Sequence, residues 1–307
     1  MTDINKIIID LIGENKSIKE ISNILNISER QLYIRIKQII NYGYVLEPSY
    51  SYNSDIYYNI KKDNNICGTN RIDIKMSKSN DMFRCLVVSD LHIGSVDADI
   101  KLMDIVYEYA IKNGINVILN CGDIIEGDYT SSKKNLKSVD AQLEYLIKRY
   151  PYDKNINNFL VLGNHEYHSL SYDGFDICRA IKNSRYDLVA IGFGQSNIYK
   201  KNDTIILFHK LKDNFKPIIN GEKILLSGHG HMMKTKLRDI FWLGIPTLSY
   251  KSNYKTKDVI PGFIELNIEI ENNRFSYVEA KHLIITPNIV HVSEVRGKVK
   301  NLFKGNN

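Results

Sequence analysis

The stretch LVVSDLHIG at residues 86–94 decides the fold, because its local design returns four more times along the chain. Each time a short apolar run ends in Asp, Asn or His: VILNCGD at 117–123, FLVLGNH at 159–165, IILFH at 205–209 and ILLSGHGH at 224–231. Runs of this length are typical of strands buried on both faces. The carboxyl ends of such strands form the edge where α/β sheets place their sites. The sequence therefore predicts an α/β domain with polar residues gathered at one sheet edge.

The residues at these strand ends are of the types that bind metal ions. A lone D-x-H or H-x-H usually belongs to a solvated loop, but here five of the eight histidines follow the apolar runs in order. Imidazole nitrogens combined with carboxylate and amide oxygens suit Mn, Fe, Co, Ni or Zn, whereas Mg and Ca prefer oxygen alone. No thiolate belongs to the set, which argues against a structural zinc site. We expect two adjacent divalent ions sharing one carboxylate, with Mn the first candidate.

The ordered set D-x-H, G-D, G-N-H-E, a lone His and G-H-x-H, over about residues 83–290, resembles the signature of the calcineurin-like metallophosphoesterase superfamily. The resemblance implies an α/β (α+β) fold, a two-sheet αββα-type sandwich. It also implies two ligand sets joined by one bridging carboxylate: Asp90, His92 and His231 for one ion, Asn164, His209 and His229 for the other, and Asp123 between them. His165 would bind no metal; it would stabilise the transition state or protonate the leaving oxygen. A hydroxide bridging both ions would attack phosphorus in line.

The stretch around Asp123 bears on the substrate. Protein phosphatases of this superfamily carry G-D-x-x-D-R-G there, whereas this chain reads GDIIEGD at 122–128, without the arginine. By analogy the site is more similar to phosphodiesterases and repair exonucleases. Our first hypothesis is a phosphodiesterase or nuclease acting on nucleic acid. The alternatives are a phosphodiesterase of a small or cyclic nucleotide, a phosphomonoesterase, and a DNA-binding regulator with a nucleotide-sensing domain.

Several neighbours of the motif residues have two interpretations each. Glu166 either orients the imidazole of His165 or forms a structural salt bridge. Lys210 and Lys234 lie close after proposed ligands, so they either contact a polyanionic substrate or solvate the rim. Tyr129 is more readily explained as one of twenty tyrosines than as a base-stacking residue.

The first sixty residues predict a separate helical module. Ser17 with Glu20 and Ser28 with Gln31 have the spacing of capping boxes, so helices are expected from Ser17 to Leu25 and from Ser28 to about 42. An apolar-periodic stretch precedes them, and residues 44–60 predict a hairpin with its turn at 53–55. This order resembles a winged helix-turn-helix.

On the last of these helices, four polar or aromatic side chains fall outside the apolar stripe and are candidates for DNA contact: Arg30, Gln31, Tyr33 and Lys37. The alternative is a module for dimerisation or docking. Residues 1–80 hold 11 Lys/Arg and 9 Asp/Glu, which is little positive charge for a duplex binder.

Length, composition and cysteine content predict the domain organisation and the cellular environment. With 307 residues, 43% hydrophobic and 25% charged, the chain is a core-forming one without disorder or low complexity. We expect a winged-helix-like domain at 1–62, a linker at 63–81, a catalytic domain at 82–291 and a basic tail at 292–307. The absence of a long apolar run and of a basic leader excludes a membrane partner. Four scattered cysteines without a C-x-x-C pair predict reduced thiols and a cytoplasmic protein.

Overall fold

The computed structural model describes residues 3–41, 45–50, 56–61, 72–73, 81–129, 133–173, 176–200, 203–219, 224–237, 240–251, 259–272 and 274–299. The chain divides into two compact units, one made of Met1–Gly68 with Leu170–Asp176 and the other of Thr69–Ser169 with Ile177–Asn307. The expected linker at 63–81 lies mostly outside the described residues.

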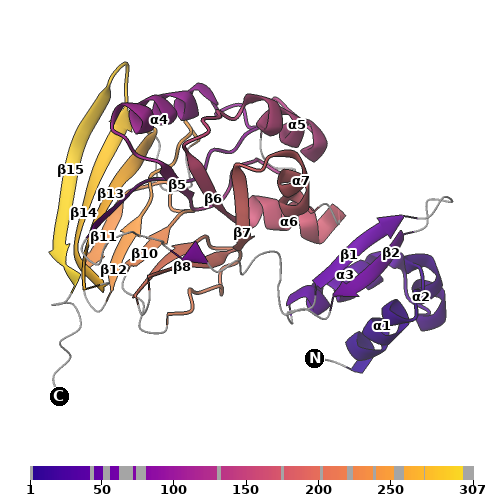
Figure 1. Cartoon of the computed structure of the whole chain (residues 1–307). Helices are drawn as coiled ribbons and strands as arrows, with labels where there is room; N and C mark the ends of the chain where they lie inside the picture. Colours follow the sequence, from indigo (N-terminus) through magenta and orange to yellow (C-terminus); the bar gives the residue numbers. More distant parts are fainter. Residues whose placement is uncertain are drawn as a thin grey trace. The chain divides into compact units, whose positions relative to one another are not determined.

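The N-terminal residues form the elements that the sequence predicts, three helices and a hairpin: α1 (Asp3–Gly13), α2 (Ile18–Leu25), α3 (Glu29–Asn41), β1 (Val45–Tyr50) and β2 (Ile56–Lys61) (Figure 1). Both predicted caps are present. The Ser17 amide donates to Glu20 Oε2 at 2.7 Å and the Glu20 amide to Ser17 Oγ at 3.2 Å, while the Ser28 amide donates to Gln31 Oε1 at 2.9 Å. These bonds satisfy amides that a helix start leaves free.

Apolar side chains of the three helices and of β2 share one small core. It contains Ile8, Ile21, Leu32, Ile39 and Tyr58, all at most 5% exposed. Burial of this stripe, with helical spacing on α1 and α3, explains why three short helices are stable together.

Two sheets build the larger unit. The seven-stranded sheet has the order β15-β14-β13-β4-β5-β6-β7 (Figure 1). Its strands are β4 (Asp81–Val88), β5 (Val117–Asn120), β6 (Asn157–Leu162), β7 (Leu188–Phe193), β13 (Gly262–Glu271), β14 (Arg274–Ile285) and β15 (Ile289–Lys298). Strands β4, β5, β6 and β7 run parallel to one another, and β13 pairs antiparallel with β4.

The six-stranded sheet has the order β11-β12-β10-β9-β8-β3. Its strands are β3 (Ile72–Asp73), β8 (Gln195–Lys200), β9 (Asp203–Phe208), β10 (Ile224–Ser227), β11 (Lys234–Leu237) and β12 (Phe241–Gly244). The five apolar runs identified in the sequence are therefore strands, as predicted. They belong to two sheets: β4, β5 and β6 to the larger, and β9 and β10, which pair in parallel, to the smaller.

The two sheets share one core. Buried side chains from both of them form a single cluster, including Val87, Leu119, Leu207, Leu226 and Leu266, each fully buried. Strands β9 and β10 are buried along their whole length, which explains why they carry apolar residues at successive positions. The sandwich thus fixes the strand ends relative to one another.

Four helices lie between the parallel strands: α4 (Lys101–Lys112), α5 (Val139–Arg149), α6 (Asn164–Asp173) and α7 (Ile177–Ser184). Within the described residues no helix follows α7, so the second helical layer of the expected αββα arrangement is not found there. On the six-stranded sheet, Phe215 and Trp242 pack against a cluster of Ile206, Phe208 and Leu225 instead. Loop and strand side chains bury this apolar surface in place of a helix.

The C-terminal boundary and one cysteine differ from expectation. Strand β15 continues to Lys298 and pairs with β14, so residues 292–298 are part of the sheet and not of a basic tail. The guanidinium of Arg296 pairs there with Glu279 at 2.7 Å. Cys85 and Cys121 are buried free thiols, as predicted, but Cys178 is disulfide-bonded. None of the described helices has the length and apolarity needed to cross a bilayer.

Candidate metal centre

The loops after five strands carry the predicted ligands to one place. Asp90 and His92 follow β4, Asp123 follows β5, Asn164 begins α6 after β6, His209 follows β9, and His229 and His231 follow β10. Two groups of side chains bring their ligand atoms within 4.8 Å of one another: Asp90 with His92 and His231, and Asp123 with His209 and His229. These are the groups that the sequence predicts for two metal ions.

The backbone of these loops is strained at the candidate ligands themselves. Five non-glycine residues of the site have a positive φ between 52° and 68°: Asp90, His92, Asp123, His229 and His231. A non-glycine residue rarely adopts this left-handed conformation, which costs free energy and tends to persist at functional sites.

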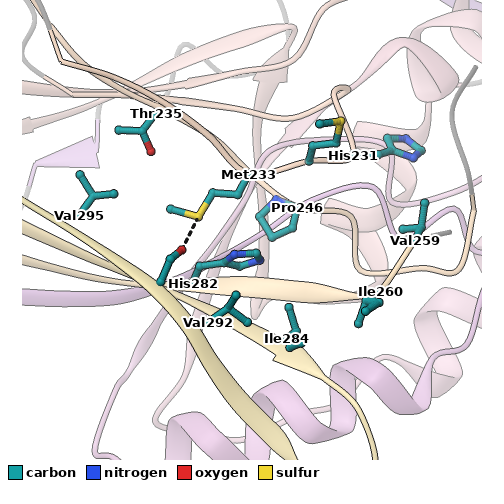
Figure 2. A pocket seen from close by; sticks show the side chains of 12 residues that line it. His231, Met233, Thr235, Pro246, Val259, Ile260, His282, Ile284, Val292 and Val295 are labelled. Carbon is teal, nitrogen blue, oxygen red and sulfur yellow. Dashed lines mark hydrogen bonds between the residues drawn. The ribbon is translucent and has the colours of Figure 1, made fainter. Parts of the chain in front are cut away.

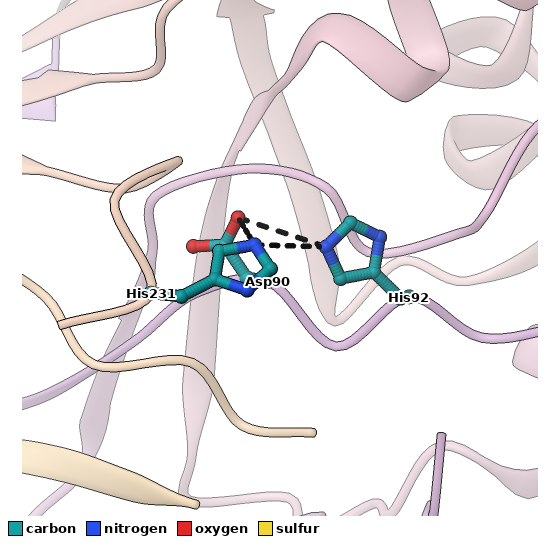
Figure 3. A group of neighbouring side chains, drawn as sticks. All are labelled: Asp90, His92 and His231. Carbon is teal, nitrogen blue, oxygen red and sulfur yellow. Dashed lines mark hydrogen bonds and ion pairs between the residues drawn. The ribbon is translucent and has the colours of Figure 1, made fainter. Parts of the chain in front are cut away.

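In the first group the metal-type atoms face one another across a short gap. The Nε2 atoms of His92 and His231 lie 3.3 Å apart. The Oδ1 atom of Asp90 lies 3.3 Å from Nε2 of His231 and 3.8 Å from Nε2 of His92. Figure 3 shows the two imidazoles turned toward each other beside this carboxylate. All three side chains are nearly excluded from water.

The second group is centred on the amide of Asn164. Its Oδ1 lies 3.0 Å from His209 Nε2 and 2.9 Å from His229 Nδ1. The Oδ2 atom of Asp123 lies 3.1 Å from the same His209 nitrogen. The other end of the same side-chain amide lies 3.2 Å from the Tyr129 hydroxyl.

Backbone carbonyls hold the other nitrogen of three rings. The Nδ1 atom of His209 lies 2.6 Å from the Cys121 carbonyl, that of His231 lies 2.9 Å from the Lys251 carbonyl, and that of His165 lies 2.6 Å from the Glu126 carbonyl. A ring that donates from Nδ1 in its neutral form keeps the Nε2 lone pair free. The folded chain therefore presents Nε2 of each of these histidines to the centre.

The donor set fits divalent ions, on two observations. The Nε2 atoms of His92 and His231 face each other 3.3 Å apart, while the Nδ1 atoms of both rings face other polar groups. The buried Oδ1 of Asp90 accepts no hydrogen bond. A cation among these atoms removes both conflicts, since unpaired buried acceptors are costly. Nitrogen ligands mixed with carboxylate and amide oxygens suit Mn, Fe, Co, Ni or Zn.

The ionisation of the site residues depends on their burial and on neighbouring charged groups. Burial lowers the pKa of His92 to about 4, which keeps this imidazole neutral. Burial opposes ionisation of Asp123, but the imidazoles of His209 and His165 hold the pKa of this carboxyl well below its usual range. Asp123 is thus an anion whose charge needs a positive partner. Its Oδ1 also accepts from the His165 amide at 3.0 Å, which ties the two loops together.

Glu126 and Lys251 are two site residues that sequence reasoning missed. The Lys251 ammonium contacts both carboxylate oxygens of buried Glu126 at 2.6 Å, and Glu126 Oε2 lies 3.0 Å from His92 Nδ1. Burial opposes ionisation of Glu126, but the hydrogen bond with His92 lowers its pKa to about 2. The acid in GDIIEGD was a signal for Glu126, whereas nothing near Lys251 in the sequence marks it.

Glu166 has neither of the roles expected for it. Its carboxylate accepts backbone amides from Asp123 at 3.2 Å, Ile125 at 2.9 Å and Gly163 at 2.6 Å. It therefore holds the loop after β5 against the start of α6. Burial and the charge of Asp123 raise the pKa of Glu166 to about 7.

The structure places the two predicted substrate lysines differently. Lys210 lies beside the site, since its charge adds to the effect of burial in lowering the pKa of the candidate ligand His229. The Lys210 ammonium pairs with Asp213 at 2.8 Å, within its own loop. Lys234 is exposed on β11. Tyr129, in contrast, lies in the site: its ring stacks on His168 at 4.3 Å and tilts over His165 at 4.4 Å between ring centroids.

The candidate DNA contacts lie on α3 in the N-terminal unit. Arg30 and Gln31 are exposed, although the Gln31 side chain is engaged in the cap of its own helix. Tyr33 is half-buried and packs against the core of this unit. The side chain of Lys37 lies outside the described residues.

With this geometry in place, the profile of the calcineurin-like phosphoesterase family matches residues 83–279. The chain therefore belongs to the calcineurin-like phosphoesterase family. It is accordingly a metal-dependent phosphoesterase, a hydrolase of phosphoester bonds. No curated protein matches the chain in sequence.

Solved structures that the chain resembles come from several organisms. Vps29 from Entamoeba histolytica, in complex with zinc, is 15% identical, with a TM-score of 0.40 over 70% of this chain and 99% of its own. Vps29 from Cryptosporidium parvum is 16% identical, with a TM-score of 0.41 over 72% of this chain and 100% of its own. Nuclease MPE from Pseudomonas putida is 13% identical, with a TM-score of 0.31 over 75% and 98%.

Proposed function

We propose that the chain is a phosphodiesterase that cleaves nucleic acid with two divalent ions, Mn²⁺ being the first choice. One ion would be held by Asp90, His92 and His231, the other by Asn164, His209 and His229, with Asp123 shared. The observation that carries the proposal is the convergence of imidazole lone pairs and carboxylate oxygens on two adjacent positions.

When bound, the two ions polarise the phosphoryl oxygens and lower the pKa of water, which supplies the nucleophile. The chain's own residues orient the substrate and move protons. His165 is the residue suited to act on the leaving oxygen, because its Nδ1 is fixed by the Glu126 carbonyl and its Nε2 lies 3.7 Å from Asp123 Oδ2, beside the ligands. A protonated Nε2 there would donate to the departing alkoxide as a general acid.

The charge of the site favours a diester over a monoester. A phosphomonoester brings two negative charges, and a diester brings one. Among the lysines that the structure describes next to candidate ligands, Lys251 pairs with the buried Glu126 carboxylate and Lys210 with the exposed Asp213. Coulomb attraction from an unpaired cation is what a dianion would need.

Nucleic acid is the preferred diester because of the N-terminal unit. Three helices, a left-handed turn residue at Asn26 between α2 and α3, and a following hairpin support a winged helix-turn-helix. Arg30, exposed on α3, and Lys37 would contact DNA. The competing proposals are hydrolysis of a small or cyclic nucleotide, with the N-terminal unit serving association, hydrolysis of a monoester, and a nucleotide-sensing DNA-binding regulator.

A metal-by-substrate screen tests the proposal. The whole chain is assayed with Mn²⁺, Zn²⁺, Co²⁺ or Ni²⁺ against plasmid, single-stranded DNA, RNA, cyclic nucleotides, bis(p-nitrophenyl) phosphate and p-nitrophenyl phosphate. We expect Mn²⁺-dependent cleavage of bis(p-nitrophenyl) phosphate and of a polynucleotide, abolished by EDTA. Turnover undiminished in excess chelator contradicts the metal mechanism, and cleavage of cyclic nucleotides alone transfers the assignment to the first competing proposal.

A further inference from the structure

Two histidines of the site have different surroundings. His231 borders a pocket whose walls come from the segment after it and from strands β14 and β15 (Figure 2). His165 is not among the described residues that line this pocket, and its Nδ1 faces the Glu126 carbonyl at 2.6 Å. Since a carbonyl oxygen only accepts hydrogen bonds, His165 carries a hydrogen on Nδ1. The direction of its Nε2 therefore depends on where the Glu126 carbonyl lies.

The peptide group that carries this carbonyl is held by Gln142. This residue belongs to α5 and is fully buried. Its Oε1 accepts the Gly127 amide at 2.8 Å. The Gly127 N–H and the Glu126 carbonyl belong to one planar peptide unit, so fixing the first also fixes the second. A hydrogen-bonded chain thus runs from Gln142 through this peptide to His165, and in such a chain each bond polarises the next.

The nitrogen of the same side-chain amide fixes its orientation. Nε2 of Gln142 donates to the Gly127 carbonyl at 3.1 Å and to the Leu136 carbonyl at 2.9 Å, which uses both of its hydrogens. The side chain also packs against Gly94, where a Cβ would lie 2.5 Å from Gln142 Cγ. One buried side chain therefore contacts the loop after β4, the loop after β5 and the segment before α5.

We propose that Gln142 is a positioning residue for His165. Acting through the Glu126–Gly127 peptide, it keeps the hydrogen on Nδ1 of His165 and directs Nε2 toward the leaving oxygen. Gln142 itself contacts neither the ions nor the substrate. Its effect on turnover rests on the proposed phosphodiesterase function, whereas its effect on the His165 ring does not.

Two isosteric substitutions separate this role from a general contribution to stability. Gln142→Met keeps the length of the side chain and removes all three hydrogen bonds. Gln195→Met is the matched control, because Gln195 likewise binds both backbone groups of one residue, the Ile218 amide at 2.8 Å and its carbonyl at 3.0 Å. Gln142→Glu restores an acceptor for the Gly127 amide. If Gln142→Met does not fold, Gln142→Asn, whose shorter arm cannot reach the same groups, replaces it in both measurements.

The first measurement is independent of turnover. Long-range ¹H–¹⁵N correlation spectra of the whole Zn²⁺-loaded chain, labelled with ¹⁵N-histidine, report the tautomer of His165 at the alkaline end of its titration. The signal is assigned by its loss in His165→Ala. We expect one tautomer, with the hydrogen on Nδ1, in wild type, Gln195→Met and Gln142→Glu, and a mixture of both tautomers in Gln142→Met. An unmixed tautomer in Gln142→Met would overturn the proposal.

The second measurement is a double-mutant cycle. We expect Gln142→Met to lower kcat on a polynucleotide about tenfold and to change bis(p-nitrophenyl) phosphate turnover little, because nitrophenolate needs little protonation. In the His165→Ala background the same substitution should cost nothing further. An equal loss in that background would overturn the proposal, since Gln142 would then act independently of His165. A wild-type chain that hydrolyses no phosphoester would contradict the proposed function alone, and the spectra would still decide the role of Gln142.

Discussion

The ammonium of Lys251 lies 2.6 Å from each carboxylate oxygen of Glu126, at the edge of the metal centre. Between them these two residues hold three imidazoles. The Glu126 carboxylate faces His92 Nδ1 and its carbonyl faces His165 Nδ1, while the Lys251 carbonyl faces His231 Nδ1. They bind no metal in our account, but they fix the orientation of the proposed ligands His92 and His231 and of the proposed acid His165. Such partners of metal-bound histidines strongly affect affinity.

Breaking this pair should weaken metal binding. Lys251→Met leaves the buried Glu126 carboxylate without its cation, so we expect His92 to reorient and the affinity of the first site to fall ~10–100-fold. Lys148→Met is the matched control, because Lys148 pairs with Glu144 on an exposed helix face. Competition with a chromophoric chelator measures both affinities. Equal affinities in the two variants would remove Lys251 from the account.

Gly163 sits where any side chain would collide with the shared carboxylate. A Cβ there would lie 2.2 Å from Asp123 Oδ1 and 2.7 Å from the Asp123 amide nitrogen, whereas a Cβ at Gly230 would meet nothing within 4 Å. We expect Gly163→Ala to lose ~10²-fold in kcat/KM, since displacement of reacting groups by about 1 Å costs that much. Gly230→Ala should keep wild-type turnover. Similar turnover in both variants would mean that Asp123 is not held in the reacting geometry.

Asp123 and His92 should differ in what their loss costs. Asp123→Asn removes the charge that both ions would share, whereas His92→Ala removes one ligand of one ion. We expect the Asn variant to lose more activity and to retain one ion or none, and the Ala variant to retain the second ion. Metal content after dialysis measures the difference. Two tightly held ions in Asp123→Asn would contradict the bridging role.

His165 should matter most when the leaving group is basic. If its imidazole protonates the departing oxygen, His165→Ala should keep both metals and lose ~10²–10⁴-fold in turnover of a nucleic-acid backbone. The loss should be smaller for bis(p-nitrophenyl) phosphate, because nitrophenolate needs little protonation. Steady-state kinetics on both substrates checks this. Equal losses would leave His165 only an electrostatic role, and loss of a metal would make it a ligand.

The sequence was informative about strands and about the identity of the candidate ligands. Buried strands such as β9 and β10 are recognisable in the sequence as apolar runs, and the candidate ligands follow directly after them. Ser17 and Glu20 likewise specify a helix start locally. Hydrophobic periodicity does not indicate which strands pair with one another. Strands β6 and β9 have similar apolar sequences but belong to different sheets. The basic residues near the C-terminus led to the wrong prediction of a tail from residue 292, whereas Arg296 and Lys298 belong to strand β15.

The surroundings of the ligands could not be predicted for a related reason. Glu126 and Lys251 are 125 positions apart, and only the closed sandwich brings them together. The left-handed backbone at Asp90 and His231 also has no local signature, because the fold imposes it. Glu166 was seen as a partner for an imidazole or a cation, but its nearest donors are backbone amides, which carry no sequence signal.

Anomalous scattering from crystals of the whole chain grown with Mn²⁺ tests the central claim most directly. We predict two peaks: one among Asp90, His92 and His231, the other among Asn164, His209 and His229, with the Asp123 carboxylate between them. A single peak would contradict the account. So would a peak in the neighbouring group of His92, Glu126 and His165, whose atoms also converge within 4.8 Å but where we place the ammonium of Lys251.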